Sequence, residues 1–122
     1  HQAGDHVLQE VGRLLRSSTR GGDIACRYGG EEFLLVLPNT PTAMAVQRAE
    51  ELRAATEALP VSWDGQSRGI TISAGVATYL DPGMAGDLVI SRADAALYAA
   101  KSAGRNQVRA AGETPTCAAL RS

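Results

Sequence analysis

The chain has little cysteine, few aromatic residues and almost no lysine, and these shortages already exclude several kinds of protein. Its 122 residues include two cysteines, Cys26 and Cys117, which are too few for a disulfide framework and indicate two unpaired thiols. No apolar run approaches the roughly 20 residues of a membrane-spanning helix, so we expect no direct membrane insertion. The net charge is −1 and basic residues form no cluster, which argues against a nucleic-acid partner. A cytoplasmic location fits these properties.

Hydrophobic residues make up 44% of the chain, which suits one globular domain with a single core. Their spacing, with the turn signals between them, predicts helices over about 5–16, from about 41 to 59, and over 87–103. Thr40 or Thr42 is expected to cap the second helix. Strands are expected over 23–28, 31–37, 61–63 and 68–79, with a short strand at 107–109.

This order of elements predicts an α+β fold. Strands grouped between helices favour a mixed or antiparallel central sheet with flanking helices. Hairpin turns of two residues also do not allow the parallel crossovers of a Rossmann fold. Residues 1–109 are expected to form the domain, and 110–122 lack periodicity and are expected to be a disordered tail.

The most informative stretch runs from Arg27 to Phe33. Gly29 and Gly30 indicate a tight turn where backbone can approach a ligand closely, and the carboxylates of Glu31 and Glu32 follow directly. Carboxylates beside such a turn suit a divalent cation and nucleotide phosphates. A turn with solvated, solubilising glutamates would have the same sequence, so the motif alone leaves both interpretations open.

Further motifs occur in a consistent order along the chain. Together they make the chain resemble a GGDEF domain, the catalytic domain of bacterial diguanylate cyclases. The residues that carry the resemblance are His1-x-x-Gly4-Asp5, Arg27-Tyr28-Gly29-Gly30-Glu31-Glu32-Phe33, Thr71-Ile72-Ser73-Ala74-Gly75-Val76-Ala77 and Ala93-Asp94-Ala95-Ala96-Leu97-Tyr98-x-Ala100-Lys101-x-x-Gly104-Arg105-Asn106.

The resemblance implies a nucleotide-cyclase fold, which is ferredoxin-like or polymerase-palm-like. It implies condensation of two GTP molecules into cyclic di-GMP by a homodimer, with Mg²⁺ or Mn²⁺ as the cofactor. By similarity, Glu31 is the metal ligand and Glu32 is a second acidic group beside it. Gly29 and Gly30 would then allow the backbone to lie against the nucleotide. The alternative is a catalytically inactive GGDEF module that binds cyclic di-GMP or GTP as a sensor.

Other substrate contacts follow from the same resemblance. Lys101 and Arg105 are four positions apart, so we expect them on one face of the last helix, where the family contacts the triphosphate. Cations at a helix end also complement the helix dipole, which is the alternative explanation. Asp5 matches the guanine-contacting aspartate of the family, although a helix N-cap explains an aspartate there equally well. Asp94 is interpreted as structural, near the sheet-facing side of its helix.

Arg20 and Asp23 match the family's inhibitory site, which binds the cyclic di-GMP product. A simple charged turn would also have this four-residue pattern. The second arginine that often completes the site would align near Glu51, which Arg48 and Arg53 flank. Because the usual second arginine is not at that position, we do not predict that this site cross-links two domains.

Members of the family carry a first strand and loop upstream of the position of His1, with a metal-binding aspartate and phosphate-holding amides. We expect a domain without that strand to be inactive alone, because several contacts to the transition state would be lost together. An upstream sensory or regulatory domain is a further expected partner.

Overall fold

The computed structural model describes residues 2–29, 32–59, 61–78 and 85–111. The described helices are α1 (Gln2–Ser17), α2 (Thr42–Glu57) and α3 (Gly86–Ser102). The described strands are β1 (Ile24–Gly29), β2 (Glu32–Val36), β3 (Val61–Trp63), β4 (Gln66–Arg68), β5 (Ala74–Val76) and β6 (Val108–Ala110).

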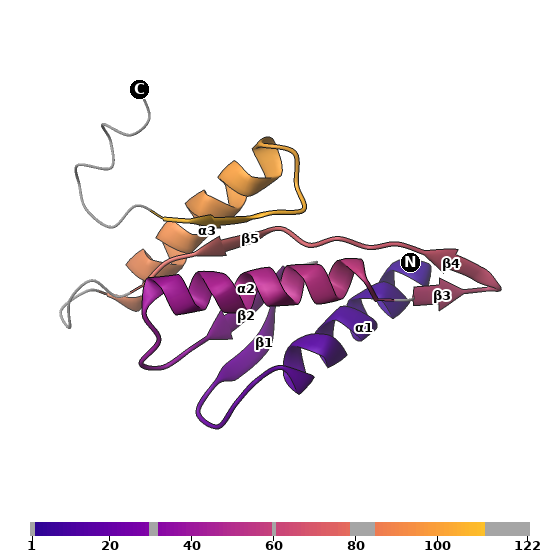
Figure 1. Cartoon of the computed structure of the whole chain (residues 1–122), viewed down its shortest axis with the longest axis horizontal. Coiled ribbons are helices and arrows are strands. Elements are labelled where there is room, and N and C mark those ends of the chain that lie inside the picture. The colour runs from indigo at the N-terminus through magenta and orange to yellow at the C-terminus, as the bar shows by residue number, and fades with distance from the viewer. Residues whose placement is uncertain (1, 30–31, 60, 79–84, 112–122) are drawn as a thin grey trace.

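The expected α+β class is confirmed, and the described strands hydrogen bond in three pairs. β1 pairs antiparallel with β2, β3 pairs antiparallel with β4, and β5 pairs parallel with β6. Asp64 and Gly65 turn the β3–β4 hairpin with φ values of 56° and 78°, which is the left-handed geometry of a two-residue hairpin turn. This hairpin projects beyond the ends of the helices (Figure 1).

One strand prediction was wrong in its extent. The segment 68–79 is not a single strand, because β4 ends at Arg68 and β5 begins at Ala74. Ile70 and Ile72, whose alternation predicted the strand, pack against the hydrophobic core without belonging to a strand. Alternation shows that the chain is extended with one buried face, but it does not show that a neighbouring strand is available for pairing.

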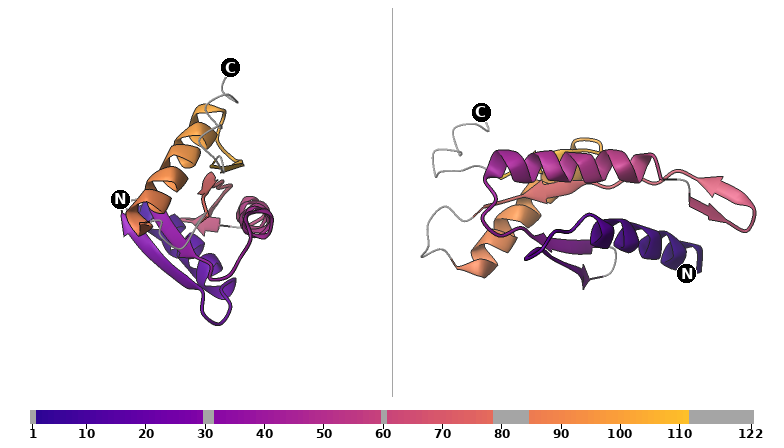
Figure 2. Two further views of the ribbon diagram at one scale, coloured as in Figure 1. Left: turned by 90° about the vertical axis from the view of Figure 1, so that its left-hand side faces the viewer. Right: turned by 60° about the horizontal axis from the view of Figure 1, so that its bottom comes forward.

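The parallel β5–β6 pair, beside two antiparallel pairs, fits the expectation of mixed strand pairing. Two-residue turns cannot join parallel strands, but the segment between β5 and β6 is long enough to contain α3. The end of the chain therefore forms a β-α-β unit. Its strands lie between α2 and α3, and both helices contact them (Figure 2).

The described core is centred on the packing of α1 against α2. Val11 and Leu15 of α1 and Leu52 of α2 are buried together, and Phe33 and Leu35 of β2 pack on them. This contact holds the β1–β2 hairpin against the helices. None of the described helices is both long and apolar enough to cross a membrane.

The expected threonine cap of α2 is wrong. Pro41 occupies the N-cap position, and its extended backbone (φ −62°, ψ 155°) leads into the helix without a side-chain cap hydrogen bond among the described residues. Thr40 donates its hydroxyl to the carbonyl oxygen of Pro38. The hydroxyl oxygens of Thr42 and Thr78 lie 2.5 Å apart, so Thr42 ties the start of α2 to the segment after β5.

Strand β5 approaches the backbone of α3 unusually closely at Gly75. A Cβ atom at residue 75 would lie 2.1 Å from the carbonyl oxygen of Ala93 and 2.3 Å from the amide nitrogen of Leu97. Both distances are far below van der Waals contact. The strand and helix can therefore pack in this way only with glycine at residue 75.

We predict that Gly75→Ala destabilises the domain by about 1–3 kcal/mol or more, because a backbone contact cannot yield as a flexible side chain can. Chemical denaturation followed by circular dichroism measures this. Gly69→Ala is the matched control, since a Cβ there meets no described heavy atom within 4 Å. Equal midpoints for the two variants would contradict the packing argument.

Candidate functional site

The glycine-glutamate motif lies where β1 meets β2. The two strands pair from Ile24 opposite Val36 to Gly29 opposite Glu32, and the register shifts between Arg27 and Gly29. Irregularities of this kind bend a strand and redirect its side chains, and they are common beside active sites. Glu32 begins β2 and is half-buried. Gly30 and Glu31 lie outside the described residues.

The predicted triphosphate contacts lie at the end of α3, but not as helical neighbours. Lys101 is exposed in the last turn of α3, where its charge also complements the helix dipole. The helix ends at Ser102, so Arg105 lies beyond it, and the expectation of one shared helix face is wrong. The reason is Gly104, whose φ of 121° turns the chain out of the helix. The Arg105 side chain is exposed.

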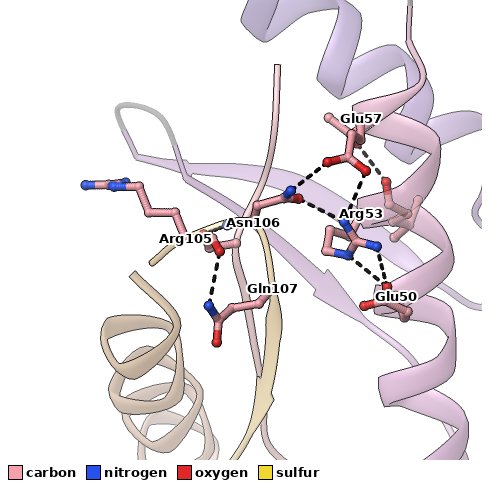
Figure 3. Close-up of polar contacts among 9 residues, drawn as sticks. Glu50, Arg53, Glu57, Arg105, Asn106 and Gln107 are labelled. Atoms are coloured by element: carbon pink, nitrogen blue, oxygen red, sulfur yellow. Dashed lines mark hydrogen bonds and ion pairs between the residues drawn. The ribbon is translucent and has the colours of Figure 1, made fainter. Parts of the chain in front are cut away.

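A cluster of polar side chains from α2 holds the residue after Arg105 (Figure 3). Nη1 of Arg53 donates to Oδ1 of Asn106 at 2.9 Å, and Nδ2 of Asn106 donates to Oε2 of Glu57 at 2.6 Å. Arg53 also donates to Oε1 of Glu50, through Nε at 2.8 Å and Nη2 at 2.5 Å. These bonds raise the pKa of Arg53 above its ordinary value and lower the pKa of Glu50. Arg53 and Glu50 are therefore both charged at neutral pH.

The predicted product site is a closed turn. The amide of Asp23 donates to the carbonyl oxygen of Arg20 at 2.9 Å, and the amide of Arg20 donates to Oδ2 of Asp23 at 2.9 Å. Gly22 supplies the positive φ of 88° within the turn. This geometry explains the Arg-x-x-Asp spacing physically, since the two end residues bond each other. It leaves the Arg20 side chain exposed.

Arg48 also belongs to this site, although the sequence indicated only that it flanks the expected position of the second arginine. Its Nη2 lies 2.9 Å from Oδ2 of Asp23 and donates to the carbonyl oxygen of Ser18 at 3.0 Å. The side chains are largely covered, at 13% exposed for Arg48 and 6% for Asp23. Glu51, where the second arginine was sought, is exposed. Arg48 lies about one helical turn before Glu51, so helical spacing on α2 was the signal that could have found it.

The Arg20 amide and the Arg48 guanidinium together hold the pKa of Asp23 below its ordinary value of 3.8, although burial acts in the opposite direction. Asp23 therefore stays ionised across the physiological range. Its carboxylate anchors the turn and orients Arg48.

Two other predicted residues lie differently from expectation. Asp5 is exposed in the first turn of α1, where it complements the helix dipole, but it is not the N-cap because α1 begins at Gln2. Asp94 is exposed on α3, so its expected place near the sheet-facing side is wrong. The buried face of α3 instead carries Ala96 and Ala100.

The structure brings some predicted residues together and leaves others separate. Arg20, Asp23 and Arg48 form one cluster, and Arg105 adjoins the α2 cluster through Asn106. In the part of the chain that the structure describes, no hydrogen bond or ion pair involves the side chains of Glu32, Lys101 or Arg105. No group of three or more metal-ligating side chains occurs there either.

Comparisons with known proteins show the family of the chain. The family model described as "Diguanylate cyclase, GGDEF domain" matches residues 1–107. The chain belongs to the GGDEF domain family of diguanylate cyclases. It is 44% identical over 108 residues to Diguanylate cyclase A of Treponema denticola, which covers 88% of this chain and 29% of that protein.

Solved GGDEF structures share the fold. The GGDEF domain of DgcB from Caulobacter crescentus, solved in complex with c-di-GMP, is 32% identical with a TM-score of 0.79, covering 90% of this chain and 66% of that one. The active GGEEF domain of a diguanylate cyclase from Vibrio cholerae is 30% identical with a TM-score of 0.79, covering 93% of this chain and 72% of that one. The chain spans less than a third of the first two curated relatives, at 29% and 16% of their lengths.

We predict that Asp23 stabilises the GGDEF domain in a pH-dependent way. Because its folded-state pKa is lowered, its contribution is fully present above 3.8 and is lost as the pH falls through the lowered value. Asp23→Asn should therefore lower the melting temperature at about pH 7, and the difference from wild type should shrink below 3.8. Asp64→Asn, at an exposed hairpin turn, is the control. A melting difference independent of pH would contradict the assignment.

Proposed function

We propose that the protein carrying this GGDEF domain condenses two GTP molecules into cyclic di-GMP and releases two pyrophosphates. The observation that carries the proposal is the pair of exposed cations, Lys101 and Arg105, in a chain that retains Gly29-Gly30-Glu31-Glu32. The family match and the similarity to a GGEEF domain described as active support it.

The chemistry requires positioning and charge neutralisation more than covalent catalysis. Each of two domains would hold one GTP, and each ribose 3′-hydroxyl would attack the α-phosphate of the other GTP, with pyrophosphate as the leaving group. A homodimer is therefore the catalytic unit. Lys101 would act as a point charge on the triphosphate, and Arg105 would bind it through its planar fork. Gly29 and Gly30 would let the backbone lie against the nucleotide.

A divalent cation, Mg²⁺ or Mn²⁺, fits the acidic residues of the motif. Carboxylate oxygens are the ligands that these hard cations prefer, and the half-buried Glu32 forms no ion pair with any described residue. Glu31 is the proposed ligand, with Glu32 as the acidic group beside it. When bound, the cation would polarise phosphate oxygens and stabilise developing charge.

The remaining proposals concern the recognition of guanine, the cellular location and the neighbouring domain. The exposed carboxylate of Asp5 would accept hydrogen bonds from the N1–H and 2-amino groups of guanine. We place the domain in the cytoplasm, where GTP is available, downstream of a sensory or regulatory domain.

Product inhibition is proposed at the Arg20–Asp23 turn. Arg20 is the exposed group that would contact the phosphate or guanine edge of cyclic di-GMP. Asp23 and Arg48 support the turn from its covered side, because their side chains are largely buried and bond each other. Arg48 thus supports the site from within the same domain, at a position where no second arginine was expected.

We predict that Glu31→Ala brings cyclic di-GMP synthesis below detection, because the metal loses its carboxylate ligand. Lys101→Ala should lower kcat/KM about tenfold or more, since a charged hydrogen bond to phosphate is lost. Mass spectrometry of product formed by the intact protein measures both. Glu51→Ala, which removes an exposed carboxylate on α2, is the control. Undiminished product from Glu31→Ala would overturn the proposed activity.

We predict that Arg20→Ala weakens cyclic di-GMP binding about tenfold or more, because it removes a charged contact. Arg48→Ala should weaken binding less, since it loosens the turn without removing the contact. Calorimetric titration of cyclic di-GMP decides this. Arg109→Ala, an exposed arginine bonded to Gln107, is the matched control. Equal affinity of Arg20→Ala and wild type for cyclic di-GMP would contradict the proposed inhibitory site.

A further inference from the structure

Three successive residues after α3 have left-handed backbone. The φ values are 121° for Gly104, 64° for Arg105 and 49° for Asn106. Glycine adopts this region freely, and asparagine tolerates it, but an arginine there is uncommon and strained. Residues in such conformations persist when the surrounding structure holds them, and they concentrate at functional sites.

Hydrogen bonds of Asn106 hold this left-handed backbone segment in place. Both ends of its side-chain amide are bonded to charged groups of α2, with Arg53 donating to Oδ1 and Glu57 accepting from Nδ2. Its backbone amide donates to the hydroxyl oxygen of Ser73 at 3.1 Å, on the segment that leads into β5. Arg53 is itself held by Glu50. Asn106 is thus bonded to two separate elements, and hydrogen bonds to charged groups are the stronger kind.

Arg105, which precedes Asn106, has a fixed backbone, and its side chain bonds none of the described residues. The amide of Arg105 donates to the carbonyl oxygen of the fully buried Ala100 at 3.0 Å, and its carbonyl oxygen accepts from Nε2 of Gln107 at 3.1 Å. In Figure 3 the Arg105 guanidinium extends away from the cluster around Asn106. The backbone conformation of Arg105 therefore sets the direction of its side chain.

We propose that Arg53, Glu57 and Asn106 form a positioning cluster that aims the Arg105 guanidinium at the GTP triphosphate. This inference rests on the proposed function, since it takes Arg105 to be a phosphate contact. Asn106 and its two α2 partners do not touch the nucleotide themselves. They keep the left-handed backbone populated, so that Arg105 meets the phosphates without first reorganising, as efficient positioning requires.

A double-mutant cycle tests the proposal in the intact protein. Asn106→Gly removes the amide but leaves a residue that accepts positive φ, and Arg105→Ala removes the guanidinium. Calorimetry with a non-hydrolysable GTP analogue and Mg²⁺ measures nucleotide binding for wild type, both single variants and the double variant. We expect Arg105→Ala to weaken binding about tenfold or more. Asn106→Gly should weaken it about threefold or more in the presence of Arg105 and have almost no effect in its absence.

A purely structural role would give a different result. Asn106→Gly would then weaken binding by the same factor in both backgrounds, in step with a fall in melting temperature, and the proposal would be overturned. If Arg105→Ala binds the analogue as wild type does, the phosphate role of Arg105 fails as well. Additive effects thus reject the positioning cluster alone, whereas an inert Arg105→Ala rejects both assignments.

Three further variants keep the test decisive. If Asn106→Gly does not fold, Glu57→Ala replaces it in the cycle, because Glu57 is exposed and its loss removes the acceptor of Nδ2. Glu57→Gln retains an acceptor oxygen and should restore binding to within about twofold of wild type. Arg13→Ala is the matched control, since it breaks the exposed Arg13–Glu10 ion pair on α1 and should leave binding unchanged. Failure of Glu57→Gln to restore binding would count against the proposal.

Discussion

Helix α3 lies directly on strand β5 because Gly75 has no side chain to separate their backbones. The small residues Ala96 and Ala100 are buried on the same helix. The carbonyl of Ala100 then accepts the amide of Arg105. The close contact at Gly75 thus places α3 against the strand, and Gly104 then turns the chain out of the helix ahead of Arg105.

Helix α2 supports both proposed sites of the GGDEF domain. Arg48 reaches the turn that contains Asp23, and Arg53 reaches Asn106 beyond α3. Each arginine bonds a group distant in sequence and offers several donors in a rigid plane, which suits a structural support better than a lysine would. The hydrophobic face of α2, through Leu52, holds the same helix on the core. The polar face of α2 therefore supports the two proposed sites, and its apolar face packs on the core.

Much of the fold could be predicted from local signals. The helices followed from apolar spacing, and Asp64-Gly65 predicted a hairpin that the φ values confirm. The extent of the strand after that hairpin could not be predicted, because Ile70 and Ile72 alternate whether or not a partner strand is present. Arg105 was misplaced because the left-handed turn at Gly104 changes the direction of the chain after α3.

The site was predictable to the extent that its residues form short motifs. Arg20 and Asp23 are close in sequence, and the turn that joins them is local. Helical spacing on α2 could have indicated Arg48, and Asn106 belongs to the last motif, but neither signal shows which group the residue bonds. Arg48 pairs with Asp23 across the fold, and Asn106 bonds Arg53 at a separation of 53 positions. Contacts of this kind arise from tertiary packing, which spacing along the chain does not encode.

The scarcity of lysine has a practical consequence. Lys101 is the one lysine among 12 cationic side chains, and it is exposed at the end of α3. Within this domain an amine-directed label, or an acetyl group transferred to lysine, has a single side-chain target. Such chemistry would remove one positive charge from the proposed triphosphate site and leave the other charged side chains untouched. Reductive methylation with carbon-13 would likewise place one lysine resonance at this position, as a spectroscopic reporter on the occupancy of the site.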